Sequence, residues 1–271
     1  ELFPHAHCEL PSGSDMDVDI QAGATALPLV TMALDAAMAE GGTPTAAALA
    51  RALDYYTKGG GANLPGHKYV LLATDGGPNC NSGLSCGTAA CTVNLDGQCP
   101  SGVMNCCDSS MAGPGAQTGC LDDQETLSQI KALSGAGIDT FVVGIPGTES
   151  YASSLDSFAQ AGGRANPAAP PSYYAVSAAG GAGGLTSVLD SITSSLIKTC
   201  RFQLSSAPPA LDMLNVQVDG QLVPQNGADG WDIDSTTSPP TVELKGQTCA
   251  RVESDGAQSV SVLYGCPTLI Q

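Results

Sequence analysis

The chain has 271 residues, of which 42% are hydrophobic and 13% are charged, a composition that suits one sizeable globular domain or a domain with a smaller partner. There are 9 Lys and Arg residues against 26 Asp and Glu residues, and the formal charge is -17. No basic cluster interrupts this acidity, and every apolar run is far shorter than the roughly 20 residues of a membrane span. The sequence therefore excludes nucleic acid as a partner and predicts no membrane span in this chain.

The first quarter of the chain predicts two short extended segments and then two helices. Residues 1–3 and the alternating residues 16–20 have strand patterns and are separated by a loop of Pro, Gly and Ser. From Leu27, apolar residues recur at helical spacing up to two glycines at 41–42, which predicts an amphipathic helix. A second helix is predicted to begin at Thr43, a favourable N-cap followed by Pro44, and to stop at three glycines at 59–61.

Strands and helices then alternate, with one interruption. Residues 69–74 (YVLLAT) are a continuous apolar run, typical of a strand buried on both faces in a parallel sheet, and the run ends at Asp75. Residues 76–120 are too long for an ordinary connection and are interpreted as an insertion. The pattern resumes with helices near 122–134, 152–160 and 185–196 and strands at 140–145 and 173–176. This alternation predicts an α/β fold with a doubly wound, mostly parallel sheet.

The pattern changes at Cys200. From there on we find only strand-like segments between turn signals, at 201–204, 214–218, 241–244 and 259–263. The predicted organisation is therefore an α/β domain at residues 1–199, which contains the cysteine-rich insertion at 76–120, and a small β-rich domain at residues 200–271.

Seven of the eleven cysteines fall within the insertion. Their spacing does not give the short C-x2-C pairs of structural zinc sites, so disulfides are favoured over a metal site or free thiols. Disulfides place the protein outside the cytoplasm, in the extracellular space, on the cell surface or in the periplasm. We expect the odd cysteine of the insertion to reach Cys8 or an upstream segment, and Cys249 to pair with Cys266, with Cys200 free or bonded elsewhere. The disulfide candidates are Cys8, Cys80, Cys86, Cys91, Cys99, Cys106, Cys107, Cys120, Cys249 and Cys266.

The sequence contains no nucleophile elbow, phosphate loop or dinucleotide-binding glycine motif, and no enzyme is predicted. Two hard oxygen donors are instead candidates for metal ligation. Asp75 follows a buried strand and Thr43 precedes a helix, so both are expected at the carboxyl edge of the sheet, where open α/β sheets bind ligands. A cation such as Mg²⁺ would need further oxygen ligands. From spacing alone, Thr43 can equally be a helix cap only and Asp75 a turn residue only.

Three segments follow one another along the chain: residues 41–45 (GGTPT) with the helix after them, 69–76 (YVLLATDG) and 141–145 (FVVGI). In this order and spacing they resemble the von Willebrand factor type A domain in its bacterial cell-envelope and secreted versions. The tail is similar to the C-terminal extension of those versions at 200–209 (CRFQLSSAPP), 218–220 (VDG), 230–231 (GW) and 262–267 (VLYGCP).

The resemblance implies a metal-ion-dependent adhesion site made of an Asp-x-Ser-x-Ser loop, a Thr and an Asp. Thr43 and Asp75 match the second and third parts. The first part is not found, because the segment from Ser12 to Asp15 (SGSD) has no leading Asp. By the family pattern, residues 1–4 are the second strand and residues 16–20 an antiparallel edge strand, so the first strand and its helix are expected upstream of residue 1.

The resemblance thus implies a non-enzymatic adhesion or recognition module. Mg²⁺, or Mn²⁺ or Ca²⁺, held by Thr43, Asp75 and a supplied Asp-x-Ser-x-Ser segment, would bind an exposed acidic residue of a protein ligand. Two alternatives stay open: a structural envelope protein with a non-functional metal site, and an enzyme of unrecognised type. Because the insertion leaves the chain directly after Asp75, we expect it to form a rigid wall beside the site that selects the ligand.

Overall fold

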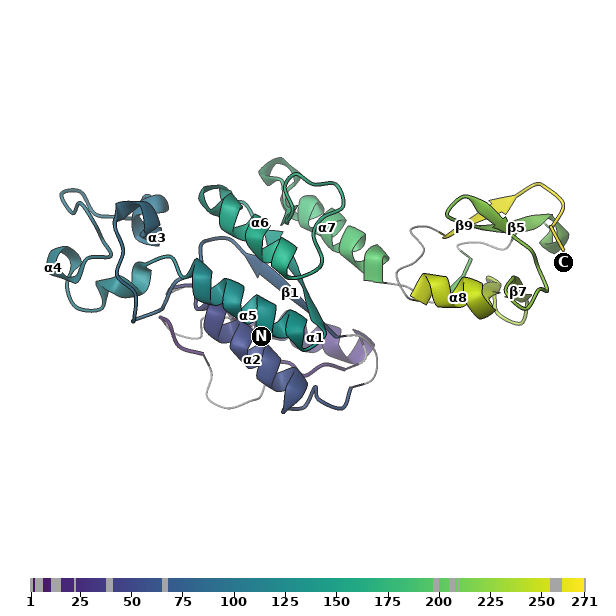
Figure 1. Ribbon diagram of the computed structural model, residues 1–271, viewed down its shortest axis with the longest axis horizontal. Coiled ribbons are helices and arrows are strands. Elements are labelled where there is room, and N and C mark those ends of the chain that lie inside the picture. Colours follow the sequence, from purple (N-terminus) through teal and green to yellow (C-terminus); the bar gives the residue numbers. More distant parts are fainter. Residues whose placement is uncertain are drawn as a thin grey trace. The chain divides into compact units, whose positions relative to one another are not determined.

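The computed structural model describes residues 2, 7–10, 16–21, 23–37, 41–64, 68–196, 200–204, 208, 210–253 and 260–270. The chain divides into two compact units, Glu1–Asp190 and Ser191–Gln271. The division falls inside helix α7 (Gly181–Leu196), so the expected boundary after residue 199 stays a prediction. Figure 1 labels the elements of both units.

The first unit contains a three-stranded parallel sheet. Its strands are β1 (Lys68–Thr74), β2 (Ile138–Gly144) and β3 (Tyr174–Ala175), in the order β1-β2-β3. β1 pairs with β2 along its whole length, from Lys68 opposite Ile138 to Thr74 opposite Gly144. The mixed α/β class and the parallel sheet agree with the sequence analysis. The three strands follow one another without the reversal of order that defines a doubly wound sheet, so that finer expectation stays a prediction.

Helices α2 (Thr45–Thr57), α5 (Asp123–Gly135) and α6 (Ala152–Ala161) lie side by side over the sheet (Figure 1). On the opposite face of β2, Phe141 and Val143 are also buried, which is why this strand is apolar throughout. The side chains that form the core under the helices are Leu49, Ile130, Leu133, Ile138, Val142, Leu155, Phe158, Ala159 and Tyr173.

The N-terminal part departs from the sequence analysis. Helix α1 (Gly23–Ala36) begins before the predicted Leu27, and none of its residues is buried, so it does not pack as the expected amphipathic helix. Residues 16–20, expected as an edge strand, form no strand and pair with none of the described strands. The extended segment predicted at residues 1–3 lies outside the described residues apart from Leu2, and the segment from Ser12 to Asp15 lies wholly outside them.

The insertion holds only short helices, and further single turns occur elsewhere in the chain. Helices α3 (Thr92–Leu95) and α4 (Ser109–Ala112) have four residues each, too few for an apolar period to be visible in the sequence. The 3₁₀ turns are η1 (Thr88–Ala90), η2 (Ala116–Gly119), η3 (Glu149–Tyr151), η4 (Ala178–Gly180) and η5 (Leu211–Met213).

The second unit consists of two antiparallel sheets and one helix. One sheet has the order β4 (Arg201–Gln203), β8 (Thr241–Leu244), β7 (Trp231–Asp234), and the other β6 (Gln221–Val223), β5 (Leu214–Val218), β9 (Val260–Tyr264). The strands predicted at 201–204, 214–218, 241–244 and 259–263 are present, whereas β6, β7 and helix α8 (Gly246–Glu253) were not predicted. Trp231 is fully buried in the core and its Nε1 donates to the Val223 carbonyl at 2.9 Å.

Across the described residues, every helix is too short or too polar to cross a membrane.

Candidate functional site

The carboxyl edge of the parallel sheet is formed by the turn after β1 and the loop after β2. The amide of Ile145 donates to the Thr74 carbonyl at 2.8 Å, which extends the pairing of β1 and β2 by one residue. Gly147 has a φ of 119°, and a Cβ there would lie 2.7 Å from the Asp75 carbonyl oxygen. Only glycine fits this close approach. The main chain of Asp75 is therefore tightly placed, while its side chain is exposed.

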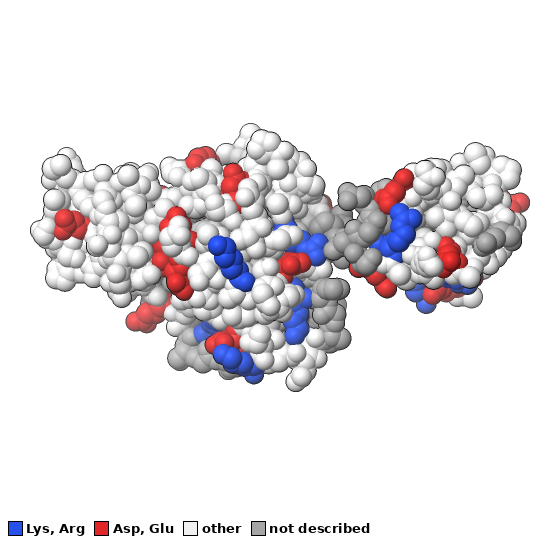
Figure 2. Space-filling view, viewed as in Figure 1, with Lys and Arg blue, Asp and Glu red and all other residues white. Residues whose placement is uncertain are grey.

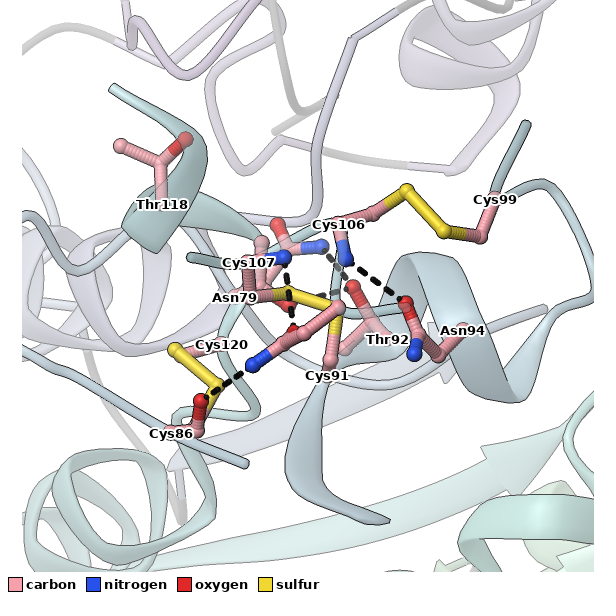
Figure 3. Close-up of a disulfide and its surroundings, with 12 residues drawn as sticks. Asn79, Cys86, Cys91, Thr92, Asn94, Cys99, Cys106, Cys107, Thr118 and Cys120 are labelled. Carbon is pink, nitrogen blue, oxygen red and sulfur yellow. Dashed lines mark hydrogen bonds between the residues drawn. A yellow bond between two sulfur atoms is a disulfide. The ribbon is translucent and has the colours of Figure 1, made fainter. Parts of the chain in front are cut away.

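Asn79 connects this edge to the loop that precedes α2. Its side-chain Oδ1 accepts a hydrogen bond from the Thr43 main-chain amide at 2.6 Å, and its main-chain amide donates to the Thr43 carbonyl at 2.9 Å. Its Nδ2 donates to Thr92 Oγ1 at 2.9 Å, and that hydroxyl donates to the Gly119 carbonyl at 2.9 Å. Figure 3 shows the Asn79 amide beside Thr92. One side chain thus links the Thr43 loop to the first helix of the insertion and, through Thr92, to the end of the insertion.

Sequence reasoning did not identify Asn79 as a site residue. It lies between Pro78 and Cys80 in a stretch of turn-forming residues, where an Asn is ordinary. Its role depends on contacts to residues 36 positions before it and 13 positions after it, and no local pattern announces them.

Thr43 does not have the capping role that the sequence suggested. Helix α2 begins at Thr45, its N-cap is Pro44, and no side chain caps it. The expectation that Thr43 caps this helix was therefore wrong, because the main chain at Thr43 is bound by Asn79 and the helix starts later. Thr43 is half-buried and is tied to the segment that follows Asp75, so both candidate ligands belong to segments joined at this edge.

Among the described residues, two groups of three His, Cys, Asp or Glu side chains lie within reach of one ion. Each group contains disulfide sulfurs, which lack the thiolate that binds metals. Asp75 belongs to neither group. Thr43 and Asp75 provide two of the roughly six oxygens that Mg²⁺ requires. The described residues therefore do not complete a cation site by themselves, and the ligand roles of Thr43 and Asp75 stay predictions.

Four disulfides organise the insertion and its attachment. Cys86–Cys120, Cys91–Cys107 and Cys99–Cys106 lie within it, and Figure 3 shows all three. Cys8–Cys80 joins its start to the N-terminal segment, as one of the two sequence-based alternatives predicted. The half-cystines at 91, 107 and 120 are at most 2% exposed, so the disulfides themselves fill the interior of a segment with few large apolar residues.

Tyr151 anchors the insertion to the body of the unit. Its hydroxyl donates to Asp96 Oδ1 at 2.7 Å and lies 3.3 Å from the Thr92 carbonyl oxygen, both in the insertion. Its ring packs against Gly77, where any Cβ would overlap it. Burial, assisted by the bond to Asp96, raises the pKa of the Tyr151 hydroxyl. The hydroxyl consequently remains protonated and available as a donor at physiological pH.

The two ends of the insertion are bonded to each other. The Cys80 amide donates to the Thr118 carbonyl at 2.7 Å, and the Asp122 amide donates to the Pro78 carbonyl at 2.8 Å. Asn81 Nδ2 donates to the Asp122 carboxylate at 2.9 Å. Asp122 is 5% exposed, and burial raises the pKa of its carboxyl. The insertion therefore stands on a closed base directly after Asp75.

The surface of the insertion is nearly uncharged. Asp96 and Asp108 are its only charged residues. Figure 2 shows this end of the first unit, at the left of the view, as mostly white. The insertion thus carries two of the chain's 26 acidic residues and no Lys or Arg.

The C-terminal disulfide differs from the expected one. Cys200 pairs with Cys249, and Cys266 is free and exposed, so the predicted Cys249–Cys266 bond was wrong. The reason is the sheet topology. β4 follows Cys200 and pairs with β8, which leads into α8 and Cys249, whereas Cys266 follows β9 in the other sheet.

No protein-family model matches the chain, and a search of curated proteins finds no match. Among solved structures, the chain is similar to two crystal structures of the pilus adhesin SpaC from Lactobacillus rhamnosus GG, one of them in an open conformation. The identity is 16% in both comparisons, and the TM-scores are 0.40 and 0.39. Each match covers 82% of this chain and 28% of the adhesin, so the chain spans little more than a quarter of that protein. A likeness this distant carries no conclusion about function.

Proposed function

We propose that this chain is a recognition module of an exported protein, and that it binds a protein ligand at the carboxyl edge of the parallel sheet. The observation that carries the proposal is the set of bonds made by Asn79, which joins the Thr43 loop, the turn that follows Asp75, and the insertion. Edges of this kind are where open α/β sheets bind ligands. The insertion, fixed by Tyr151 and by its disulfides, is the rigid wall that selects the ligand.

The disulfides support the export part of the proposal. Five disulfides involve ten of the eleven cysteines. Such bonds form and persist in oxidising compartments and are rare in the cytosol. An extracellular, cell-surface or periplasmic location follows from this chemistry.

The ligand chemistry is proposed from the resemblance to the von Willebrand factor type A domain. Thr43 and Asp75 supply two oxygens to Mg²⁺, or to Mn²⁺ or Ca²⁺, and an Asp-x-Ser-x-Ser segment supplies the others. A carboxylate of the protein ligand takes the remaining position on the ion. A cation is required for such a partner, because a chain of charge -17 otherwise repels an acidic side chain.

The test uses Mn²⁺ alone as the probe. With only two protein ligands, we expect the 271-residue chain to bind Mn²⁺ weakly, with a Kd on the order of 10⁻³ M, as measured by electron paramagnetic resonance of the free ion. Asp75→Ala should abolish this binding because Asp75 is the only carboxylate of the two candidate ligands. Asp190→Ala, which removes an exposed carboxylate from α7, is the matched control and should leave the Kd unchanged.

A second arm separates the alternatives. A Gly-rich peptide that carries one Asp should bind the chain only when Mn²⁺ is present, and the same peptide with Asn should not bind. Mn²⁺ binding of equal strength in wild type and Asp75→Ala would refute the ligand assignment. Absence of peptide binding both with and without Mn²⁺ would favour a structural envelope protein with a non-functional metal site.

A further inference from the structure

Two disulfides of the insertion lie against each other. The sulfurs of Cys86, Cys107 and Cys120 are all within 4.8 Å of one another, although Cys107 is bonded to Cys91 and the other two form the second bond. Figure 3 shows both bonds. The second disulfide therefore meets the first at the Cys107 sulfur. A third sulfur beside a disulfide is the arrangement from which thiol–disulfide exchange proceeds, because a thiolate attacks one of the two bonded sulfurs.

The main chain before Cys120 brings the two disulfides together. A Cβ at Gly119 would lie 3.0 Å from the Cys107 sulfur, so a glycine lets the main chain pass beside that sulfur. The Gly119 carbonyl is held by the Thr92 hydroxyl at 2.9 Å. Cys91 and Cys120 also pair as an isolated antiparallel bridge. The distance between the two disulfides is thus fixed by backbone contacts.

The four sulfurs differ in their access to solvent. Cys91, Cys107 and Cys120 are at most 2% exposed, whereas Cys86 is half-buried. A thiol in solution can therefore attack at Cys86, and the sulfur it displaces is that of Cys120. The displaced thiolate is released in the interior of a segment that contains no Lys or Arg to balance its charge. Such a thiolate reacts with the nearest disulfide sulfur, which is Cys107.

We propose that Cys86 is a modification site for low-molecular-weight thiols, and that exchange then passes inward from Cys120 to Cys107. The incoming thiolate bonds to the Cys86 sulfur and displaces Cys120 as a thiolate. The Cys120 sulfur then bonds to Cys107 and displaces Cys91, which takes up the proton that the incoming thiol lost. The number of disulfides is unchanged when the mixed one is counted, and the thiol is the only co-reactant. This chemistry does not depend on the function proposed above.

The experiment treats the full chain briefly with glutathione. Cys266, which is free and exposed, is first blocked with iodoacetamide. The thiols released by glutathione are then trapped with N-ethylmaleimide in mildly acidic denaturant, where protonation of the thiols stops exchange. Cleavage before Asp residues places Cys91 and Cys120 in different peptides. We expect glutathione on Cys86 and a new bond between Cys107 and Cys120. Trapped Cys91 should exceed trapped Cys120 about tenfold or more, because attack within the chain is faster than return of the dilute thiol.

Two glycine variants test the internal step. Gly119→Ala adds a Cβ between the two disulfides and should lower the ratio of trapped Cys91 to trapped Cys120 about tenfold. Glutathione uptake at Cys86 should not change, since this variant leaves the exposed sulfur untouched. Gly87→Ala lies next to Cys86, where a Cβ meets open space, and is the matched control. It should keep the ratio within about twofold.

Folding of each variant is checked by its unfolding temperature and by its disulfide map before glutathione is added. If Gly119→Ala does not fold, the double variant Cys91→Ser, Cys107→Ser replaces it. In that variant Cys120 has no disulfide to attack and must itself be trapped. Three results would each overturn the proposal: no glutathione on Cys86, a wild type that traps Cys120 and keeps the Cys91–Cys107 bond, or equal ratios in wild type and folded Gly119→Ala.

Discussion

Asn79 is the residue on which the geometry of the candidate site depends most. Its side-chain amide accepts from the Thr43 main-chain amide and donates to Thr92 Oγ1. We expect Asn79→Ala to destabilise the first unit by about 1–3 kcal/mol, since partly buried donors and acceptors lose their partners. Thermal unfolding measures this loss of stability. The Asn79→Ala substitution should also speed hydrogen exchange of the Thr43 amide.

The matched control is Asn63→Ala, at an exposed Asn between α2 and β1. Surface substitutions of this kind change stability by about 0.5 kcal/mol or less. If the two variants unfolded at the same temperature, the central role given to Asn79 would be wrong.

Asp122 should make the protein less stable as pH rises, whereas a carboxylate in an ion pair makes a protein more stable as pH rises. Burial raises the pKa of Asp122 above its usual 3.8, so the folded state holds this proton more tightly than the unfolded state does. Stability is then greatest below 3.8 and falls as pH rises through the folded-state pKa. Asp122→Asn keeps an acceptor for Asn81 and removes the buried charge. We expect this variant to unfold a few degrees above wild type at pH 7, with the two converging in acid.

The measurement is the unfolding temperature of both proteins across the acid range. Asp123→Asn, one residue later and more exposed, serves as the control and should show no such convergence. A variant that lost stability at pH 7 would indicate that the ionised carboxylate, rather than its acceptor capacity, holds the base of the insertion.

Elements with a clear hydrophobic period were predictable from the sequence. The run from Tyr69 to Thr74 and the helical spacing after Thr45 predicted a strand and a helix, and both form close to their expected positions. The expectation that the strand is buried on both faces was wrong, because Leu71 and Ala73 are exposed on one face while Leu72 and Thr74 are buried on the other. Helix α8 was missed because its residues (GQTCARVE) bury little, with Val252 its one buried side chain. Residues 16–20 alternate like a strand, but alternation expresses only which side chains are buried, and a strand also needs a ladder partner.

The position of the candidate site could be predicted from the sequence, but the contacts that hold it together could not. The strand end at Asp75 fixes the edge, because a parallel sheet presents the ends of its strands together. The parts that hold the edge together, Asn79, Gly147 and Tyr151, act across gaps of tens of residues. The same limit explains the C-terminal disulfide, because the pairing of Cys200 follows from strand order and could not be read from cysteine spacing.

At the scale of the whole molecule, no disulfide joins the two units. Cys200–Cys249 lies in the second unit, and the other four bonds lie in the first. The single Trp, Trp231, is buried in the second unit and reports on its unfolding alone. We expect calorimetry to resolve two transitions, of which one coincides with the change in Trp fluorescence.

Paired Ser variants assign the transitions. Replacing Cys200 and Cys249 by Ser opens a loop with a sequence separation of 49. The free energy of unfolding reported by Trp fluorescence should fall by about 4 kcal/mol, and the other transition should stay at its temperature. Replacing Cys8 and Cys80, with a separation of 72, should have the reverse effect. Transitions that move together in both variants would mean that the chain unfolds as one cooperative body.

The closed base of the insertion has a consequence for how this protein can change over generations. Since Cys80 bonds to Thr118 and Pro78 to Asp122, the loop between them begins and ends at one place, and doubling its length costs only about 0.6 kcal/mol in closure entropy. Apart from Thr92 and Asp96, which bond to Asn79 and Tyr151, residues 82–117 can therefore be replaced by mutation or recombination while β1 and α5 keep their places. Cysteines inside this loop must be gained or lost in pairs, because they are bonded to each other as Cys91–Cys107 and Cys99–Cys106. Cys86 is the exception, since its partner Cys120 lies beyond the loop. Variation of the outer face is thereby uncoupled from the folding of the sheet that carries it.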